Sequence, residues 1–384
     1  MFKSKKSIWI SILSLIMIIS IAGCSPASKS NSSTATTSEK SKISFTDLSG
    51  RKVELDGPAK RIFLGFYAES FIAINGGVDN VVCISKAEWS EFFNAQYKAY
   101  EASVPELKNI IDTGSIYKGS FSMETTISLA PDVAILAPFQ FETLGENVKK
   151  LEEAGTKIVV VDYNAQKVDR HVLSTEIIGM ITGKTERAKE LSDEYVAAVE
   201  DVKNRVAHLN DNEKRRVYIE LGNLGAQEYG NSYGDYMWGG LAITAGGNNI
   251  AFGKIESYGP LSPEYILSSD PEYIFLAGSI WSNDTGNRVK IGYGVDSKET
   301  NNRIEPYTKR PGWNKISAIK NDNIYAVDHA GLRSIYDYVY LQFIAKSMYP
   351  DLFKDVNPEE NILKFYENYL PIKATGCFMT KYEK

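Results

Sequence analysis

A sixteen-residue segment occurs twice in this 384-residue chain and limits the possible folds more than any other feature. Residues 122–137 read SMETTISLAPDVAILA, and residues 262–277, displaced by 140 positions, read SPEYILSSDPEYIFLA with six identities. In each copy a glutamate, Glu124 or Glu264, lies two residues after a serine, and a proline-acid pair begins seven residues after the glutamate. Two copies of one segment indicate two similar lobes, each presenting a glutamate at the same place.

The N-terminus reads as a targeting signal followed by a tether. Three lysines precede the apolar run Ile8–Ile21, which is too short for a comfortable membrane span. The run ends in Ile-Ala-Gly-Cys24, which resembles a bacterial lipobox, so we expect residues 1–23 to be a lipoprotein signal peptide and Cys24 to be lipidated. The alternatives are an ordinary secretory signal with a chance cysteine, or an uncleaved anchor. Residues 24–42 are rich in Ser, Thr, Asn and Lys and are expected to form a flexible tether. The expected location is therefore the extracytoplasmic face of the cell membrane.

Charge and cysteine content exclude several classes of protein. The formal net charge is −5, and removal of the lysine-containing signal makes it more negative, which argues against nucleic-acid binding and against a polybasic membrane role. Beyond Cys24 only Cys83 and Cys377 remain. They allow one disulfide, which stays open, but neither a disulfide framework nor a cysteine-based zinc site.

Short apolar runs alternate with helical patterns along the rest of the chain, which is typical of an α/β fold. Residues 43–55 predict a β-hairpin with a turn at Ser49-Gly50. The other predicted strands are 61–65, 81–84, 133–136, 157–161, 216–220, 273–276 and 323–327, and the shorter helices are 68–75, 124–129, 147–154, 235–245 and one from about 336. Residues 172–208 form the longest helical stretch, punctuated by Gly183 and placed between the repeated segments. We predict an N-terminal α/β lobe over 43–170, a connector helical region over 171–209 and a C-terminal α/β lobe over 210–384.

Several segments together indicate a family. They are FTDLSGRKV at 45–53, PAKRI at 58–62, the glutamate-proline-acid pattern of each repeat, residues 312–326 from Gly-Trp to Asn-Ile-Tyr-Ala, and YPDLF at 349–353. In these segments and in its lipobox the chain resembles the substrate-binding lipoproteins of bacterial ABC importers for iron complexes and vitamin B12. The resemblance covers essentially the whole mature chain. It implies two Rossmann-like lobes joined by a long rigid helix, a ligand cleft between the lobes, a monomer, no enzymatic activity and no cofactor.

The resemblance also implies how the protein meets its transporter. Each lobe of such a protein offers a glutamate that pairs with arginines of the permease subunits, which work with their ATPase. The matching positions are Glu124 and Glu264, in the first turn of helices capped by Ser122 and Ser262. The alternative is that each glutamate only complements its helix dipole, an effect of about 0.3–1 kcal/mol.

Candidate ligand contacts come from the resemblance and from the general rule that ligands gather beyond the carboxyl ends of strands. The family places contacts just before each glutamate helix, which here are Tyr117, Lys118 and Tyr258. The strand ends add Phe66, Tyr67, Lys86, Trp89, Phe139 and Gln140 in the first lobe, and Tyr229, Tyr233, Trp238, Trp281, Arg333 and Tyr336 in the second. Aromatic rings offer rigid contact area, and cationic side chains attract carboxylates or catecholates. Arg333 is the strongest single candidate, because siderophore-binding relatives place basic contacts in this loop.

Direct metal ligation is not predicted. His171, His208 and His329 lie far apart in sequence, and the chain has no His-x-x-His motif. We expect His171 and His208 to be solvated on the connector. Haem-binding relatives use an axial Tyr, His or Met, so Tyr67 or His329 stays open as an iron ligand.

The sequence therefore predicts a receptor that captures a metal chelate, with a ferric siderophore as the best candidate, and delivers it to an ABC permease. Haem or a corrinoid is the alternative within the same class. An exported hydrolase would need a motif such as Gly-x-Ser-x-Gly or His-Glu-x-x-His, and neither is present. A surface adhesion lipoprotein would require neither paired glutamates nor an aromatic cleft.

Overall fold

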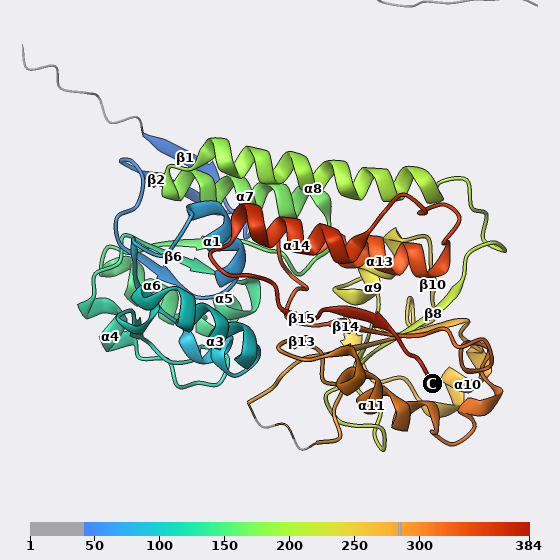
Figure 1. Cartoon of the computed structure of the whole chain (residues 1–384). Helices are drawn as coiled ribbons and strands as arrows, with labels where there is room; N and C mark the ends of the chain where they lie inside the picture. Colours follow the sequence, from blue (N-terminus) through green and yellow to red (C-terminus); the bar gives the residue numbers. More distant parts are fainter. Residues whose placement is uncertain (1–41, 283, 285) are drawn as a thin grey trace, which may run out of the picture. The chain divides into compact units, whose positions relative to one another are not determined.

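The computed structural model describes residues 42–384 except 283 and 285 (Figure 1). The predicted signal peptide, Cys24 and all but the last residue of the predicted tether lie outside the described residues. Within the described residues, no helix combines the length and the apolar character that crossing a bilayer requires.

The first sheet is fully parallel and has the order β5-β4-β3-β6-β7. Its strands are β3 (Ile62–Leu64), β4 (Val81–Ile84), β5 (Ile111–Asp112), β6 (Val133–Leu136) and β7 (Lys157–Val160). Short apolar runs suit such a sheet because its strands are buried on both faces, and every residue of β3 and β6 is buried. The connecting helices are α1 (Ala68–Asn75), α2 (Lys86–Ser90), α3 (Asn94–Ser103), α4 (Met123–Ser128), α5 (Pro138–Leu144) and α6 (Asn147–Glu153), with a 3-10 turn at Pro105–Lys108. We call the part built on this sheet the N-terminal lobe.

The predicted hairpin is present and closes one edge of this sheet. Strands β1 (Ile43–Thr46) and β2 (Lys52–Leu55) pair antiparallel. The turn between them reaches β7, because the Leu48 amide donates to the Val160 carbonyl at 3.0 Å and the Val160 amide donates to Oδ2 of Asp47 at 3.0 Å. The outer strand of the sheet is therefore not left unpaired along its whole length.

The predicted connector is two helices instead of one continuous stretch. Helix α7 (Val168–Thr182) ends at Gly183, whose φ of 72° is left-handed, and α8 (Thr185–Val206) begins two residues later. The two helices pack side by side, so the chain reverses at Gly183 (Figure 1). Helix α8, with 22 residues and a length of about 33 Å, contacts α1 of the N-terminal lobe and also α13.

The second sheet has the order β10-β8-β12-β14-β16, and its last strand is antiparallel to β14. The strands are β8 (Arg216–Leu221), β10 (Asn248–Asn249), β12 (Tyr273–Gly278), β14 (Ile324–Asp328) and β16 (Met379–Lys381). Two small antiparallel pairs join β9 (Ser232–Tyr233) to β11 (Tyr258–Gly259) and β13 (Gly292–Tyr293) to β15 (Gly376–Cys377). We call the part built on this sheet the C-terminal lobe.

The helices of the C-terminal lobe are α9 (Trp238–Thr244), α10 (Pro263–Ser269), α11 (Ser297–Thr308), α12 (Ser317–Lys320), α13 (Tyr338–Met348) and α14 (Pro358–Tyr369), with a 3-10 turn at Trp313–Lys315. Two of them are shorter than predicted at the N-terminal end: α9 begins at Trp238 instead of 235, and α13 begins at Tyr338 instead of about 336.

The repeated segment occupies the same topological place in both lobes. Each copy forms a short helix and then a strand, α4 with β6 and α10 with β12. Each strand pairs with the first strand of its sheet, β6 with β3 and β12 with β8. These are the positions where the strand order reverses, and open α/β sheets bind ligands at the carboxyl ends of such strands. The predicted α/β fold with two lobes is confirmed.

Candidate ligand-binding cleft

A pocket lies where the carboxyl ends of β3 and β4 meet the loop that follows β14. The N-terminal lobe contributes Phe66, Tyr67, Trp89 and Phe93, and the loop after β14 contributes Arg333. The pocket therefore joins the two lobes, as the sequence predicted for a ligand cleft.

Arg333 is the only cation that lines this pocket among the described residues. Its guanidinium carbon lies 5.6 Å from the ring centroid of Phe66 and 5.3 Å from that of Phe93. Its Nε atom is buried and has no hydrogen-bond partner. Burial lowers the pKa of Arg333, and the nearby phenols of Tyr67 and Tyr233 act in the opposite direction. Glu69 also lines the pocket, but among the described residues no acid forms an ion pair with Arg333.

Tyrosines surround this guanidinium from both lobes. The Tyr67 hydroxyl donates to Oδ1 of Asn164 at 2.8 Å. Tyr233 lies on β9, paired with Tyr258 on β11. Burial raises the pKa of Tyr67, Tyr233 and Tyr236, so all three phenols stay protonated and can donate hydrogen bonds.

Unusual backbone conformations gather at the junction of the lobes. Tyr67, Gln166, Met237 and Arg333 are four of the seven non-glycine residues with positive φ in the described part of the chain. Such conformations cost on the order of 1–3 kcal/mol each and persist where the surroundings fix them, often at ligand sites. Their grouping supports the view that this junction is a functional site.

A row of aromatic side chains leads from the pocket to the surface of the N-terminal lobe. Phe66 contacts Phe139 at 5.2 Å between ring centroids, Phe139 contacts Tyr117 at 6.0 Å, and Tyr117 contacts Phe92 at 6.2 Å. Tyr117 is 60% exposed. Lys118 pairs with Glu91 and lies 5.5 Å from the Phe92 ring centroid. On the opposite lobe Tyr258 is also exposed, at 57%.

Three predicted contacts lie in the interior instead. Trp238 has no exposed surface and donates from Nε1 to Nδ1 of His329 at 2.9 Å. Tyr336 is 1% exposed, and its hydroxyl donates to Glu69. The Gln140 side chain is buried and donates to the Gly65 carbonyl at 3.0 Å. These side chains are buried outside the lining of the pocket and do not offer a surface to a ligand.

The remaining candidate ligand contacts interact with other side chains of the protein. Trp89 lines the pocket while its Nε1 donates to Gln96 at 2.7 Å. Lys86 lies over the Tyr97 ring at 5.5 Å, and Trp281 lies under Arg288 at 5.8 Å. Tyr229 packs on the Arg310 guanidinium at 4.2 Å. Of this group only Trp89 lines the pocket.

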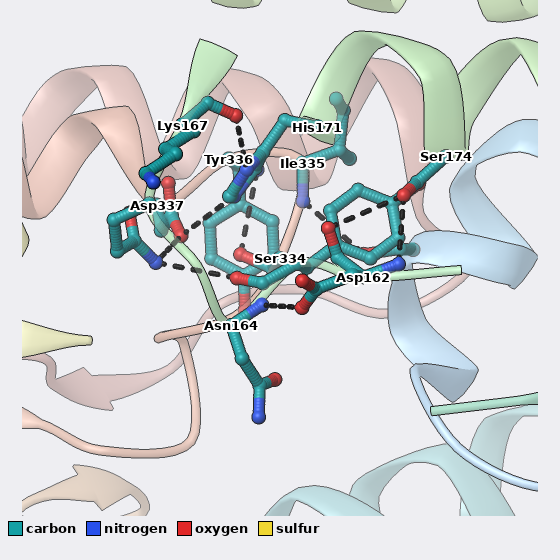
Figure 2. A network of polar contacts seen from close by, with 12 residues as sticks. Asp162, Asn164, Lys167, His171, Ser174, Ser334, Ile335, Tyr336 and Asp337 are labelled. Atoms are coloured by element: carbon teal, nitrogen blue, oxygen red, sulfur yellow. Dashed lines mark hydrogen bonds and ion pairs between the residues drawn. The ribbon is translucent and has the colours of Figure 1, made fainter. Parts of the chain in front are cut away.

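The prediction that His171 is solvated is wrong. The ring is fully buried and stacks on Tyr195 with 4.7 Å between centroids. Figure 2 shows it facing Asp337, with Nε2 at 3.3 Å from Oδ2, while Nδ1 lies 3.3 Å from the Lys167 carbonyl. The signal was available, because His171, with Ser174, Thr175 and Ile178, occupies one face of α7 at spacings of three, four and seven.

The other two histidines differ from each other. His208 is exposed, as expected. His329 is buried beside Trp238, and burial together with the charge of Arg333 holds the pKa of His329 well below its usual range. Among the described residues no group of three His, Cys, Asp or Glu side chains could hold a metal ion. Cys83 and Cys377 are both free thiols.

A buried carboxylate among the residues that line the pocket was not predicted from the sequence. Glu69 on α1 accepts from the hydroxyls of Tyr100 at 2.6 Å and Tyr366 at 2.7 Å and from Gln96 Nε2 at 2.8 Å, in addition to Tyr336. Burial raises the pKa of Glu69, while the phenol donors favour its ionised form. Its partners lie up to 297 positions away, so no local pattern could have indicated this cluster.

The repeated glutamates have matching local geometry. Ser122 accepts from the Thr125 amide at 3.2 Å, and Ser262 accepts from the Tyr265 amide at 3.2 Å. Glu124 and Glu264 follow in the first turns of α4 and α10, and both are exposed. Within residues 42–384 neither of them takes part in an ion pair.

Comparison with known proteins gives matches along nearly the whole chain. The chain is 22% identical over 360 residues to a Bacillus subtilis protein named "Uncharacterized ABC transporter substrate-binding lipoprotein YvrC", covering 92% of this chain and all of that protein. It is 23% identical over 328 residues to the "Iron-uptake system-binding protein" of the same organism, covering 83% and 90%. The crystal structure of the TroA-like periplasmic binding protein FepB from Veillonella parvula matches with a TM-score of 0.82 and 30% identity, covering 89% and 100%.

The family model described as "Periplasmic binding protein" matches residues 65–330. This range includes β6 and β12, the strands of the repeated segment, and most of the residues that line the pocket. That range is more than half of the chain. The chain therefore belongs to the periplasmic binding protein family and is a non-enzymatic, substrate-binding component of ABC importers.

Proposed function

We propose that this protein is a lipid-anchored, extracytoplasmic receptor that captures an anionic iron complex, a ferric siderophore, and delivers it as a monomer to an ABC permease. The observation that carries the proposal is Arg333, a half-buried side chain between aromatic rings at the junction of the lobes, whose Nε is buried and unpartnered and which forms no ion pair among the described residues. A buried donor of a charged group without a partner is costly, and an anionic ligand would supply that partner.

The chemistry of the pocket agrees with such a ligand. Ferric chelates of catecholates or carboxylates present negatively charged oxygens, which suit a guanidinium and phenol donors. The phenyl faces of Phe66, Phe139 and Tyr117 suit the organic part of the chelate. The name of the similar iron-uptake protein supports iron as the cargo.

The ligand class is tested by thermal shift and titration of the chain from about residue 42 onward, without the proposed anchor, against ferric siderophores, haem and cobalamin. A ligand present at a hundred times its dissociation constant stabilises the folded state by about 2.7 kcal/mol. We expect this stabilisation with an anionic ferric siderophore. A thermal shift with haem or cobalamin alone would mean that this compound, and not a ferric siderophore, is the cargo. The absence of a shift with every metal complex would contradict the proposal.

The role of Arg333 is tested by Arg333→Gln, which keeps a polar side chain and removes the charge. Losing one partner of a buried charged contact costs about 2–5 kcal/mol, so affinity for the ferric siderophore should fall at least tenfold. Lys354→Gln is the matched control, because Lys354 is an exposed cation paired with Asp351. Equal affinities for the two variants would show that Arg333 does not bind the ligand.

We propose that Glu124 and Glu264 form the permease contact, each presented from a capped first helical turn. The double variant Glu124→Lys, Glu264→Lys should bind the chelate with unchanged affinity and should fail to support its uptake by cells. Glu305→Lys is a control, since Glu305 is an exposed acid on α11. Normal uptake by the double variant would exclude docking through this pair.

The lipid anchor is tested separately, because Cys24 lies outside the described residues. Cys24→Ser should abolish labelling by a radioactive fatty acid and release the protein from the membrane fraction. Labelling that persists in this variant would exclude Cys24 as the attachment site.

A further inference from the structure

The loop that carries Arg333 is held by both lobes, including buried hydrogen bonds to the opposite one. Residues Ala330–Asp337, which we call the cleft segment, connect β14 to α13, both of which belong to the C-terminal lobe. Its own lobe holds this stretch at His329, whose amide donates to the Gly278 carbonyl at 2.7 Å and whose Nδ1 accepts from Trp238, and at Tyr336, whose ring contacts Phe365 and Tyr366 of α14. The segment also makes contacts with the other side of the cleft.

Two anchors join the cleft segment to helix α1 of the N-terminal lobe. The Ile335 amide donates to Oγ of Ser70 at 3.1 Å. The Tyr336 hydroxyl donates to the Glu69 carboxylate. All four residues are buried, so these bonds are shielded from competition by water.

A third anchor joins the end of the segment to the start of α7, which packs on α1 of the N-terminal lobe. Oδ2 of Asp337 accepts from Nε2 of Gln166 at 2.8 Å and lies 3.3 Å from Nε2 of His171 (Figure 2). The side chains of Asp337 and His171 are both completely buried. Gln166 itself has a φ of 53°, so its backbone is also constrained at this contact.

These anchors bear directly on Arg333. Its φ of 65° places it in the left-handed region, which costs on the order of 1–3 kcal/mol for a residue with a side chain. A conformation of this kind persists only where the flanking chain is fixed. Its guanidinium then lies between Phe66 and Phe93, which are both residues of the N-terminal lobe.

We propose that Asp337 and Ser70 are positioning residues that fix the cleft segment to the N-terminal lobe, so that Arg333 moves with that lobe when the cleft opens. The pocket's cation and its phenyl rings then form one preassembled surface, and Tyr233 and Tyr258 close on it from the C-terminal lobe. The assignment of Arg333 to an anionic ligand rests on the proposed function, whereas the anchoring of the segment does not.

The anchoring is tested without ligand by the reaction of the whole protein with phenylglyoxal, which modifies arginines. The extent of modification of Arg333 and Arg310 is read from peptides by mass spectrometry. In Asp337→Asn and Ser70→Ala we expect Arg333 to react about tenfold faster than in the wild type, because loss of a buried hydrogen bond is worth about 1–2 kcal/mol. Arg310, buried against Glu220 in the C-terminal lobe, should keep its wild-type rate.

Arg310 distinguishes positioning from general loosening, because a variant that is only destabilised would expose both arginines. Asp355→Asn is the matched control, since it also removes an acid bonded to a cation, Arg205, away from the cleft segment. Hydrogen exchange over residues 330–337 should rise in Asp337→Asn and Ser70→Ala and stay unchanged in Asp355→Asn.

Unchanged reactivity of Arg333 and unchanged exchange in both variants would overturn the proposal. Faster reaction of both arginines would also overturn it, by showing a merely structural role. If Asp337→Asn does not fold, Gln166→Ala removes one donor to the same carboxylate and serves in its place. The wild type's affinity for ferric siderophores is a separate result, so failure of the proposed function and failure of the anchoring are told apart.

Discussion

The thiol of Cys83 lies in the core of the N-terminal lobe, on β4. Burial raises the pKa of Cys83 to about 12, and the thiolate is the reactive form. Native protein treated with iodoacetamide at pH 8 should therefore leave Cys83 unmodified, as read by peptide mass spectrometry. Reaction should be complete after unfolding in guanidinium chloride. Rapid alkylation of the native protein would show that this core opens readily.

Arg310 and Glu220 form a buried ion pair in the C-terminal lobe, with side-chain exposures of 2% and 1%. Removal of one partner leaves an uncompensated buried charge, which costs about 3–5 kcal/mol. Arg310→Met should reduce the free energy of unfolding by this amount in urea denaturation. Arg215→Met removes an exposed cation paired with Glu272 and should change it by less than about 1 kcal/mol. Equal losses of unfolding free energy in Arg310→Met and Arg215→Met would contradict the view that Arg310 stabilises the fold by pairing with Glu220.

At the level of single residues, sequence position predicted some of the pocket and missed the rest. Tyr67 and Arg333 follow the ends of β3 and β14, and their places after strands were readable from apolar runs. Trp238 and Tyr336 also follow the expected pattern, yet they are buried, because exposure depends on what the other lobe and α14 place against them. The same long-range packing hid Glu69.

Gly183 determines where α7 ends and α8 begins. Its φ of 72° favours glycine, and an added Cβ would lie 3.0 Å from Cγ of Pro58. Gly183→Ala should therefore reduce the free energy of unfolding by about 1–2 kcal/mol, measured by chemical denaturation. Gly77→Ala is the control, because Gly77 has no positive φ and an added Cβ there meets no atom within 4 Å. A larger effect at Gly77 would contradict this explanation of the turn.

At the level of elements, short apolar runs located the strands well. Residues 81–84 and 133–136 were predicted with the bounds that β4 and β6 have. Residues 172–208 predict a helical stretch punctuated at Gly183, but a periodic apolar pattern does not reveal whether a chain continues or turns back at a glycine. The reversal at Gly183 depends on contacts with α1 and β1, which are distant in sequence.

The two lobes share buried polar groups as well as a cleft. Glu69 on α1 accepts from Tyr336 and from Tyr366 on α14, both of which belong to the C-terminal lobe. We therefore expect one cooperative unfolding transition, with coincident changes in tryptophan fluorescence and circular dichroism. Glu69→Ala should destabilise the protein by about 3–5 kcal/mol, because four buried donors lose their acceptor.

In the Glu69→Ala variant the unfolding transition followed by tryptophan fluorescence should no longer coincide with the one followed by circular dichroism. The reason is that the lobes lose their shared carboxylate. Glu101→Ala is the control, because Glu101 accepts from the single hydroxyl of Tyr97 at the surface of α3. Two separate transitions in the wild type would contradict the view that the lobes unfold together.

At the level of the whole molecule, the order of the strands within each sheet could not be predicted from the sequence. The alternation of runs predicts parallel α/β lobes, but which strands become neighbours depends on how helices pack over a finished sheet. The sheets indeed differ: in the first, the third strand in chain order, β5, lies at the edge beside the second, whereas in the other sheet the third strand, β12, is central and lies beside the first. The repeated segment nevertheless adopts equivalent positions, because it lies next to the first strand in both.

The hairpin over β7 has a practical consequence for handling the protein. It occupies backbone groups of an edge strand through Asp47 and Leu48. A recombinant chain that begins after Leu55 would expose this edge, and unpaired edges recruit strands from other molecules. Material for crystallisation or titration should therefore start before Ile43, even though the family match begins only at residue 65. Shorter chains are expected to precipitate as they are concentrated.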